Sequence, residues 1–168
     1  MKSGTYVKSG WPARILAVGA AGLFFLILSG LSLPSRGDPQ SWEVSINIYP
    51  AAITFPPADP DLEPSVAADT PVRIQVATWP PNRRWELTIR AEGNLVSAGG
   101  QVISVSAISW RATPNPPFSD GVLAAGQSLV LARNRGSQEA ELTFYFQNSW
   151  NYVAGEYTQI ITFTASMI

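Results

Sequence analysis

The sequence predicts an all-β protein, an immunoglobulin-like antiparallel β-sandwich of about seven to eight strands, preceded by an N-terminal hydrophobic helix. Several short segments alternate apolar and polar residues, which is the pattern of a strand with one buried face. The 14 prolines and 13 glycines mark turns between such segments. Because 46% of the residues are hydrophobic, the chain has enough apolar material for a core.

The N-terminal segment has the three parts of an export signal. Residues 1–14 carry three positive charges, and residues 15–31 are uncharged and almost wholly apolar. Small and helix-breaking residues follow, and Gly30 and Ser32 provide the small side chains that a cleavage site needs. An apolar run of 17 residues also approaches the length of a membrane-spanning helix. Cleavage is the favoured interpretation and a retained anchor is the alternative.

This pattern divides the chain into two parts. We expect residues 1–37 to be a signal peptide or membrane anchor and residues 38–168 to be one β-sandwich domain. Positive charges precede the apolar run, so the domain is expected on the far side of the membrane, secreted or at the cell surface. Contact with the membrane is expected only through the N-terminal segment.

Seven segments have the strand pattern, and a short eighth one is expected in a proline-rich stretch. They are residues 42–48, 71–78, 85–91, 102–110, 127–132, 140–147 and 157–165, with 53–55 as the eighth. Alternation places every second side chain on the core face. The predicted core residues are Val72, Ile74, Val76, Trp85, Leu87, Ile89, Leu142, Phe144, Phe146, Ile161 and Phe163, and Trp42 is also expected in the core.

Two details of pairing follow from the same pattern. Residues 71–78 and 85–91 are separated by a short turn, so we expect them to form an antiparallel pair. Within residues 102–110 the alternation slips near Ala107, which indicates a β-bulge or a change of sheet.

The first strand is predicted to mediate self-association. Its apolar residues Trp42, Val44, Ile46 and Ile48 are too hydrophobic to stay in water. The stretch 49–71 contains six prolines, and we expect it to be a loop or tether that does not fold compactly. Such a tether would let the strand pair with its own domain or add to a sheet edge of a neighbour.

The composition argues against the common catalytic and metal chemistries. The chain has no cysteine and no histidine, so disulfides, Cys nucleophiles, Ser-His-Asp triads and His-ligated zinc are excluded. Asp59, Asp61 and Glu63 carry oxygens that Ca²⁺ prefers, but prolines stiffen their loop and the glycine of an EF-hand is missing. We interpret them as a solvated acidic loop and expect no metal and no cofactor.

A glycosidase would need a pair of carboxylates. Glu86, Glu139 and Glu141 are the residues that could supply one, but alternation places them on the outer faces of strands. We therefore predict that the protein is not an enzyme.

The charges of the domain argue against nucleic acid as a partner. From residue 38 onward there are seven arginines, no lysine and twelve carboxylates, a net charge of −5. Phosphate contacts need concentrated positive charge. The pairs Arg83-Arg84 and Arg133/Arg135 are interpreted as solvated charges in turns.

Tryptophans in loops give the alternative function. Aromatic rings can stack on sugars, and Trp79, Trp150 and Tyr152 lie in predicted turns and loops. A secreted carbohydrate-binding module that uses these rings is therefore the second hypothesis.

The C-terminal run resembles a known family. In residues 151–165 a turn of the form Ala-Gly-x-Tyr-Thr leads into an alternating last strand, with Gly155, Tyr157, Thr158, Ile161 and Phe163 in the matching positions. This run is similar to the closing strand of secreted bacterial pilin-like sandwiches of the spore coat protein U type. The resemblance implies an extracellular structural or surface role, although several such proteins carry a disulfide that this chain lacks.

These observations lead to one expected function. We expect an exported, non-catalytic structural or adhesion-type surface protein, whose partner is itself or another surface protein.

Overall fold

The computed structural model describes residues 17–18 and 42–168. The predicted signal or anchor segment lies outside the described residues, except for Ala17–Val18. Within the described part, no helix has the length and apolar character needed to cross a membrane.

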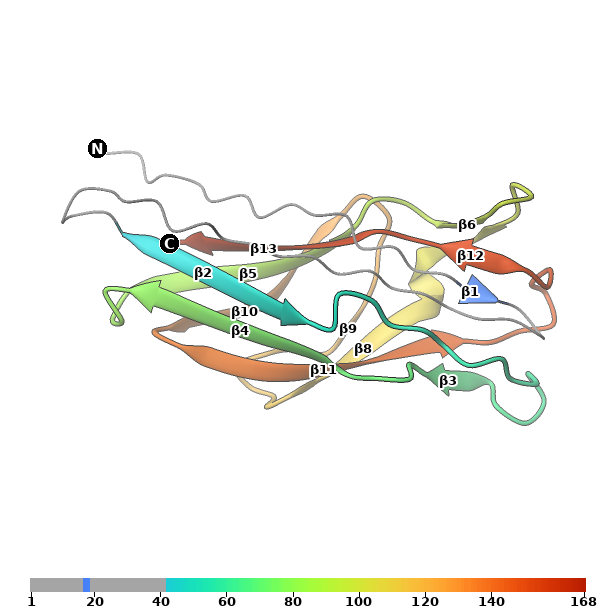
Figure 1. Ribbon diagram of the computed structural model, residues 1–168, viewed down its shortest axis with the longest axis horizontal. Coiled ribbons are helices and arrows are strands. Elements are labelled where there is room, and N and C mark those ends of the chain that lie inside the picture. The colour runs from blue at the N-terminus through green and yellow to red at the C-terminus, as the bar shows by residue number, and fades with distance from the viewer. Residues whose placement is uncertain (1–16, 19–41) are drawn as a thin grey trace.

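The described chain is all-β, and every pair of named strands is antiparallel, which confirms the predicted class (Figure 1). One sheet contains six strands, another three long strands, and a third four short strands. The six-stranded sheet has the order β2 (Glu43–Tyr49), β4 (Val72–Trp79), β11 (Gln138–Gln147), β8 (Ile108–Thr113) and β9 (Gly121–Val122), and β3 (Ser65–Ala67) also pairs with β11.

The other two sheets complete the architecture. The three-stranded sheet has the order β10 (Ser128–Arg135), β5 (Arg84–Ala91) and β13 (Ile161–Met167). The four-stranded sheet joins β1 (Ala17–Val18), β12 (Glu156–Thr158), β6 (Leu95–Ser97) and β7 (Val102–Ile103).

The core lies between the six-stranded sheet and the three-stranded sheet, as in a β-sandwich. Inward side chains of both sheets join one buried cluster. The eleven residues predicted from strand alternation for this core are each at most 3% exposed, so the inward phase of these strands is confirmed. Burial of large apolar side chains contributes about 1.5–3 kcal/mol each, which makes this cluster the main source of stability.

One predicted pairing is wrong. β4 pairs with β2 and β11, whereas β5 pairs with β10 and β13, so the turn between β4 and β5 crosses from one sheet to the other. A hairpin and a sheet-to-sheet connection can have the same length. Both also place alternate side chains inward, so alternation alone cannot distinguish them.

The proline-rich stretch 49–71 is not the loose tether that was predicted. Ile53 and Phe55 are 1% and 0% exposed, and the Phe55 ring lies 6.1 Å from that of Phe146. No strand forms at residues 53–55, but β3 forms further along and buries Val66. The prolines prevent a regular strand, yet the apolar residues between them are still driven into the core.

Two predicted strands are each divided. The slip near Ala107 is a short 3₁₀ turn, Val105–Ala107, which separates β7 from β8 and changes the sheet. The last predicted strand is divided into β12 and β13 at Gln159 and Ile160. There the buried Gln159 amide donates to the carbonyl of Asn94 at 2.8 Å, and its oxygen accepts from the backbone N–H of Ile160 at 2.6 Å.

Trp42 is not a core residue, contrary to the prediction. Its side chain is 56% exposed, because the paired strand begins one residue later, at Glu43. The Arg83 guanidinium lies 3.7 Å from the centre of the indole ring, a cation–π contact.

Candidate functional site

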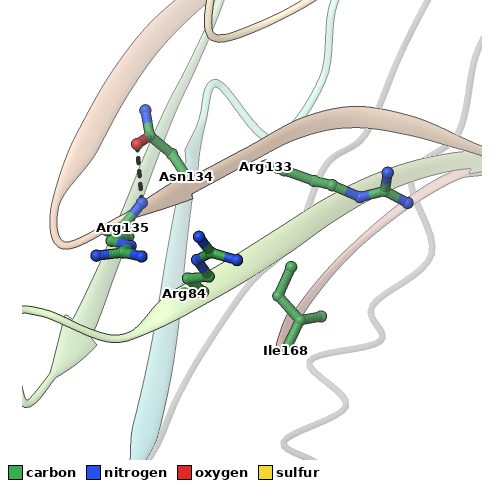
Figure 2. Close-up of a pocket in the computed structure, with 5 residues that line it drawn as sticks. All are labelled: Arg84, Arg133, Asn134, Arg135 and Ile168. Carbon is green, nitrogen blue, oxygen red and sulfur yellow. Dashed lines mark hydrogen bonds between the residues drawn. The ribbon is translucent and has the colours of Figure 1, made fainter.

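Three arginines line a pocket at one end of the sandwich. Its walls are Arg84 at the start of β5, Arg133, Asn134 and Arg135 at the end of β10, and Ile168 (Figure 2). The pocket has a volume of about 320 Å³ and is open to solvent. We call it the arginine pocket.

Strand register brings the arginines together. Arg84 and Arg135 are directly opposite each other across the β5–β10 pair, so their side chains leave the same face of the sheet. Like charges in directly opposed positions are destabilising. On the other side of Arg84, its carbonyl accepts the backbone N–H of Ile168 at 3.1 Å, which places that residue beside the pair.

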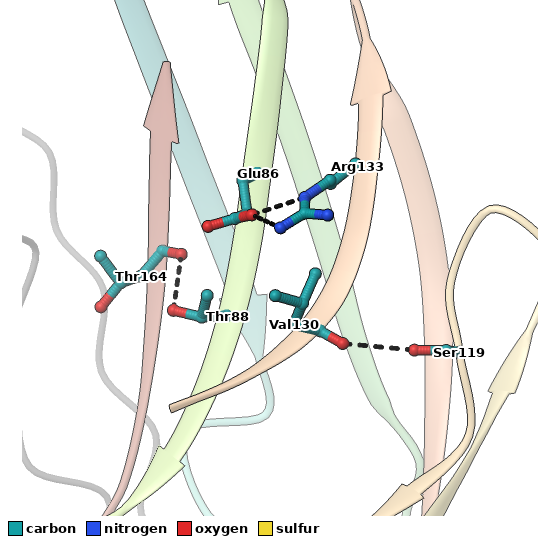
Figure 3. Close-up of polar contacts among 6 residues, drawn as sticks. All are labelled: Glu86, Thr88, Ser119, Val130, Arg133 and Thr164. Atoms are coloured by element: carbon teal, nitrogen blue, oxygen red, sulfur yellow. Dashed lines mark hydrogen bonds and ion pairs between the residues drawn. The ribbon is translucent and has the colours of Figure 1, made fainter. Parts of the chain in front are cut away.

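The three arginines differ in their partners. Arg133 Nε donates to Glu86 Oε2 at 2.6 Å, an ion pair across the same two strands (Figure 3). Among the described residues, Arg84 and Arg135 have no ion pair. Guanidinium groups bind carboxylate, phosphate and sulfate oxygens through paired N–H groups. The pocket therefore has two guanidinium groups available for an anion.

Two turns that pack on each other position the pocket. The backbone N–H of Gly136 donates to the carbonyl of Arg83 at 3.2 Å, and the buried Trp85 Nε1 donates to the carbonyl of Gly136 at 2.8 Å. Gly136 has φ of +65°, and a Cβ there would lie 2.6 Å from the carbonyl oxygen of Pro81. Only glycine fits this position without strain, so the turn after β10 is held against the turn before β5.

Sequence reasoning placed these arginines in turns but interpreted them as solvated charges. The signal that could have found the site is their distribution: four of the seven arginines of the domain lie in residues 79–85 and 128–138, and neither segment contains an acidic residue. What the sequence could not show is that these two segments are neighbours in one sheet.

The residues proposed to contact a sugar do not come together. Trp79 ends β4, at the end of the molecule where β5 begins, and is 69% exposed. The segment that follows β11 lies at the opposite end (Figure 1), and it contains Trp150 and Tyr152. Trp150 is 61% exposed, whereas the Tyr152 ring packs 5.7 Å from Phe146. These rings form no shared stacking surface.

The acidic loop is a structured turn at the end where Trp150 lies. The Asp59 carboxylate accepts the backbone N–H of Asp61 at 2.9 Å, and Asp61 Oδ1 accepts Trp150 Nε1 at 2.9 Å. In the described ranges, no group of three or more acidic residues gathers where it could hold a metal ion. The expectation of a metal-free loop therefore stays a prediction.

The glutamates considered for a glycosidase lie on two different sheets. Glu86 is on β5, in the three-stranded sheet, while Glu139 and Glu141 are on β11, in the six-stranded sheet. All three project from the outer faces, because their strand neighbours fill the core between the sheets. Glu86 therefore cannot flank one glycosidic bond together with either of the other two.

The strand predicted to self-associate lies at a sheet edge. β2 pairs with β4 along its whole length, from Glu43 opposite Trp79 to Tyr49 opposite Arg73, without a register shift. Among the described strands β4 is its only hydrogen-bonding partner. Ile46 is 8% exposed, and Val44 and Ile48 are half-buried against the core.

Comparison with known proteins assigns the chain to no family. No protein-family model matches the chain, and no curated protein matches it in sequence with significance.

Proposed function

We propose that the protein is an exported, non-catalytic structural or adhesion-type surface protein whose domain associates through the outer edge of β2. The observation that carries this proposal is an edge strand of seven residues that, among the described strands, is paired on one side only. Proteins usually protect such edges with proline, lysine or a bulge. β2 has no proline, lysine or bulge, since its sequence is EVSINIY and its register is continuous, and its one charged residue is Glu43 at the first position.

The mode of pairing differs from the one expected from sequence. β2 belongs to the sheet of its own chain, and the stretch that follows it is packed in the core, so the strand is not a free donor. The N–H and C=O groups on its outer side, which no other described strand pairs, are instead an acceptor edge, on which an extended segment of a second copy or another surface protein adds as a further strand.

Other observations support the extracellular role. The charged start, apolar run and small-residue exit of residues 1–37 are those of a signal peptide or anchor, which favours an extracytoplasmic location. The sandwich-like architecture agrees with an immunoglobulin-like fold and with the resemblance to pilin-like domains of the spore coat protein U type. Gly155 and the buried Tyr157, Ile161 and Phe163 follow the pattern of that family's closing segment.

The edge is tested by adding charge to it. Ser45 and Asn47 face outward on β2, opposite Ala77 and Gln75, and lysines there would repel an added strand. The full chain in a non-ionic detergent is expected to form oligomers in analytical ultracentrifugation. The variant Ser45→Lys/Asn47→Lys should form smaller oligomers than the wild type, because pairing along β2 is lost.

A matched control adds a lysine to the same face of an internal strand. Gln75→Lys lies beside Asn47 on β4, whose two edges are both paired, so it should leave the oligomers unchanged. A wild-type chain that stays monomeric, or equal loss of oligomers in the control, would reject edge pairing. Binding to a glycan array by that monomer would favour the sugar-binding alternative.

A further inference from the structure

The segments that form the two ends of the domain differ in the sign of their charge, although Glu43, opposite Trp79, and Glu86, paired with Arg133, lie beside the basic segments. At the end of the arginine pocket, residues 79–85 and 128–138 contain four arginines and no acidic residue. At the other end, residues 50–72 and 144–160 contain five carboxylates and no lysine or arginine. Figure 1 shows these ends at opposite extremes of the long axis, with β3 and the loop before it far from the start of β5.

The acidic end presents a preformed tip. The carbonyl of Asp59 accepts the backbone N–H groups of Leu62 and Glu63 at 3.0 and 2.7 Å, which closes a tight turn. Leu62 at its apex is 80% exposed, and Asp61 and Glu63 on either side of it are exposed. The tip is therefore an acidic–apolar–acidic triplet that is ordered before any partner binds. We call residues 61–63 the acidic tip.

The arginine pocket has the complementary composition. Arg84 and Arg135 stand side by side without carboxylate partners among the described residues, and their mutual repulsion would be relieved by an anion. Ile168, 61% exposed, gives the same pocket an apolar wall. Two guanidinium groups and one aliphatic side chain match two carboxylates and one leucine.

We propose that the arginine pocket is a carboxylate-binding site that receives the acidic tip of a second copy of this chain. Asp61 and Glu63 pair with Arg84 and Arg135, and Leu62 packs against Ile168. The contact joins two different surfaces, so each copy keeps one pocket and one tip free for further copies. Such a head-to-tail contact produces an open array, or a ring where the rotation between successive copies closes. The inference rests on the proposed self-association but uses another surface than the β2 edge.

Charge reversal at each end tests the contact. The full chain in non-ionic detergent is compared with two charge-reversed variants by sedimentation. The variant Arg84→Glu/Arg135→Glu has two acidic ends. The variant Asp61→Arg/Glu63→Arg has two basic ends. Asp59 is left unchanged because it closes the turn, whereas Asp61→Arg removes one exposed hydrogen bond, the one from Trp150 Nε1. Each variant alone should associate roughly tenfold or more weakly than the wild type, because attraction becomes repulsion. An equimolar mixture of the two should associate again.

Salt and a neighbouring arginine provide the controls. The Debye length, the distance over which exposed charges interact, shortens from about 10 Å at 0.1 M salt to about 3 Å at 1 M. The end-to-end association of the wild type should therefore weaken over this range. Arg90→Glu changes an exposed arginine on β5 outside the pocket and should have no effect. Circular dichroism shows that each variant is folded.

The outcomes separate this inference from the β2-edge proposal. Restored association in the mixture supports the head-to-tail contact even if Ser45→Lys/Asn47→Lys has no effect. If both variants associate like the wild type, or if the mixture does not recover, the head-to-tail contact is rejected. A wild type that does not associate but binds polygalacturonate through Arg84 and Arg135 would also reject it, and would assign the pocket to an acidic polymer.

Discussion

The two ends of the sandwich use their charged residues differently. At the acidic end, carboxylates complete the structure: Asp59 caps its own turn, Asp61 accepts the Trp150 indole, and Asp69 accepts the backbone N–H of Thr54 at 3.0 Å. At the arginine end, backbone groups and the indole of Trp85 hold the turns. Arg84 and Arg135 are needed for none of these contacts.

The difference indicates which charges the fold requires. An exposed charge that satisfies backbone donors contributes locally to stability, whereas two unpaired like charges in register reduce it slightly. The arginine pair is thus easier to explain by a partner than by folding. This comparison predicts that substitutions at the two ends have separable effects on stability.

The largest expected effect concerns the proline-rich stretch that supports the acidic end. Phe55→Ala should lower the free energy of unfolding by about 3–5 kcal/mol, because a fully buried aromatic ring is lost. Urea denaturation of the full chain measures it. Leu62→Ala, at the exposed apex of the same segment, should change stability by less than about 0.5 kcal/mol. Equal small costs at both positions would mean that the stretch is a loose tether after all.

A smaller effect is expected at the turn that supports the arginine end. Gly136→Ala should cost about 1–2 kcal/mol for the positive φ, and more for the contact with the Pro81 carbonyl. Gly126→Ala is the matched control, since Gly126 has φ of +69° but open space around its Cβ position. It should cost only about 1–2 kcal/mol. If thermal denaturation finds the control equally costly, the packing of the two turns does not position the pocket.

The smallest effect is a pH dependence confined to the acidic end. Burial raises the pKa of Tyr157 above its ordinary value of about 10, and its hydroxyl donates to the carbonyl of Val153 at 2.7 Å. The folded state favours the protonated phenol. The stability that Tyr157 contributes in this way is fully present below pH 10 and is lost as the pH rises through the folded pKa. Unfolding free energies measured from pH 8 to 11 should fall, and less so in Tyr157→Phe. Identical slopes would assign the alkaline loss to other groups.

Local patterns predicted much of the fold. Strand alternation identified the core residues of β4, β5 and β11 correctly, because a side chain's direction along a strand depends only on its immediate neighbours. It misplaced Trp42, since alternation does not reveal where the paired strand begins. It also missed the burial of Phe55, because proline content indicates irregular backbone and not exposure.

For the candidate site, too, some features follow from the sequence and others only from the tertiary structure. The sequence alone determined the alternating strands, the acidic balance of the domain, the lack of cysteine and histidine, and the clustering of four arginines in two short segments. Only the tertiary structure decided that β5 pairs with β10 and not with β4, which places Arg84 opposite Arg135. The physical reason is that alternation is a local property, whereas the choice of strand partner depends on how all the apolar faces are buried together.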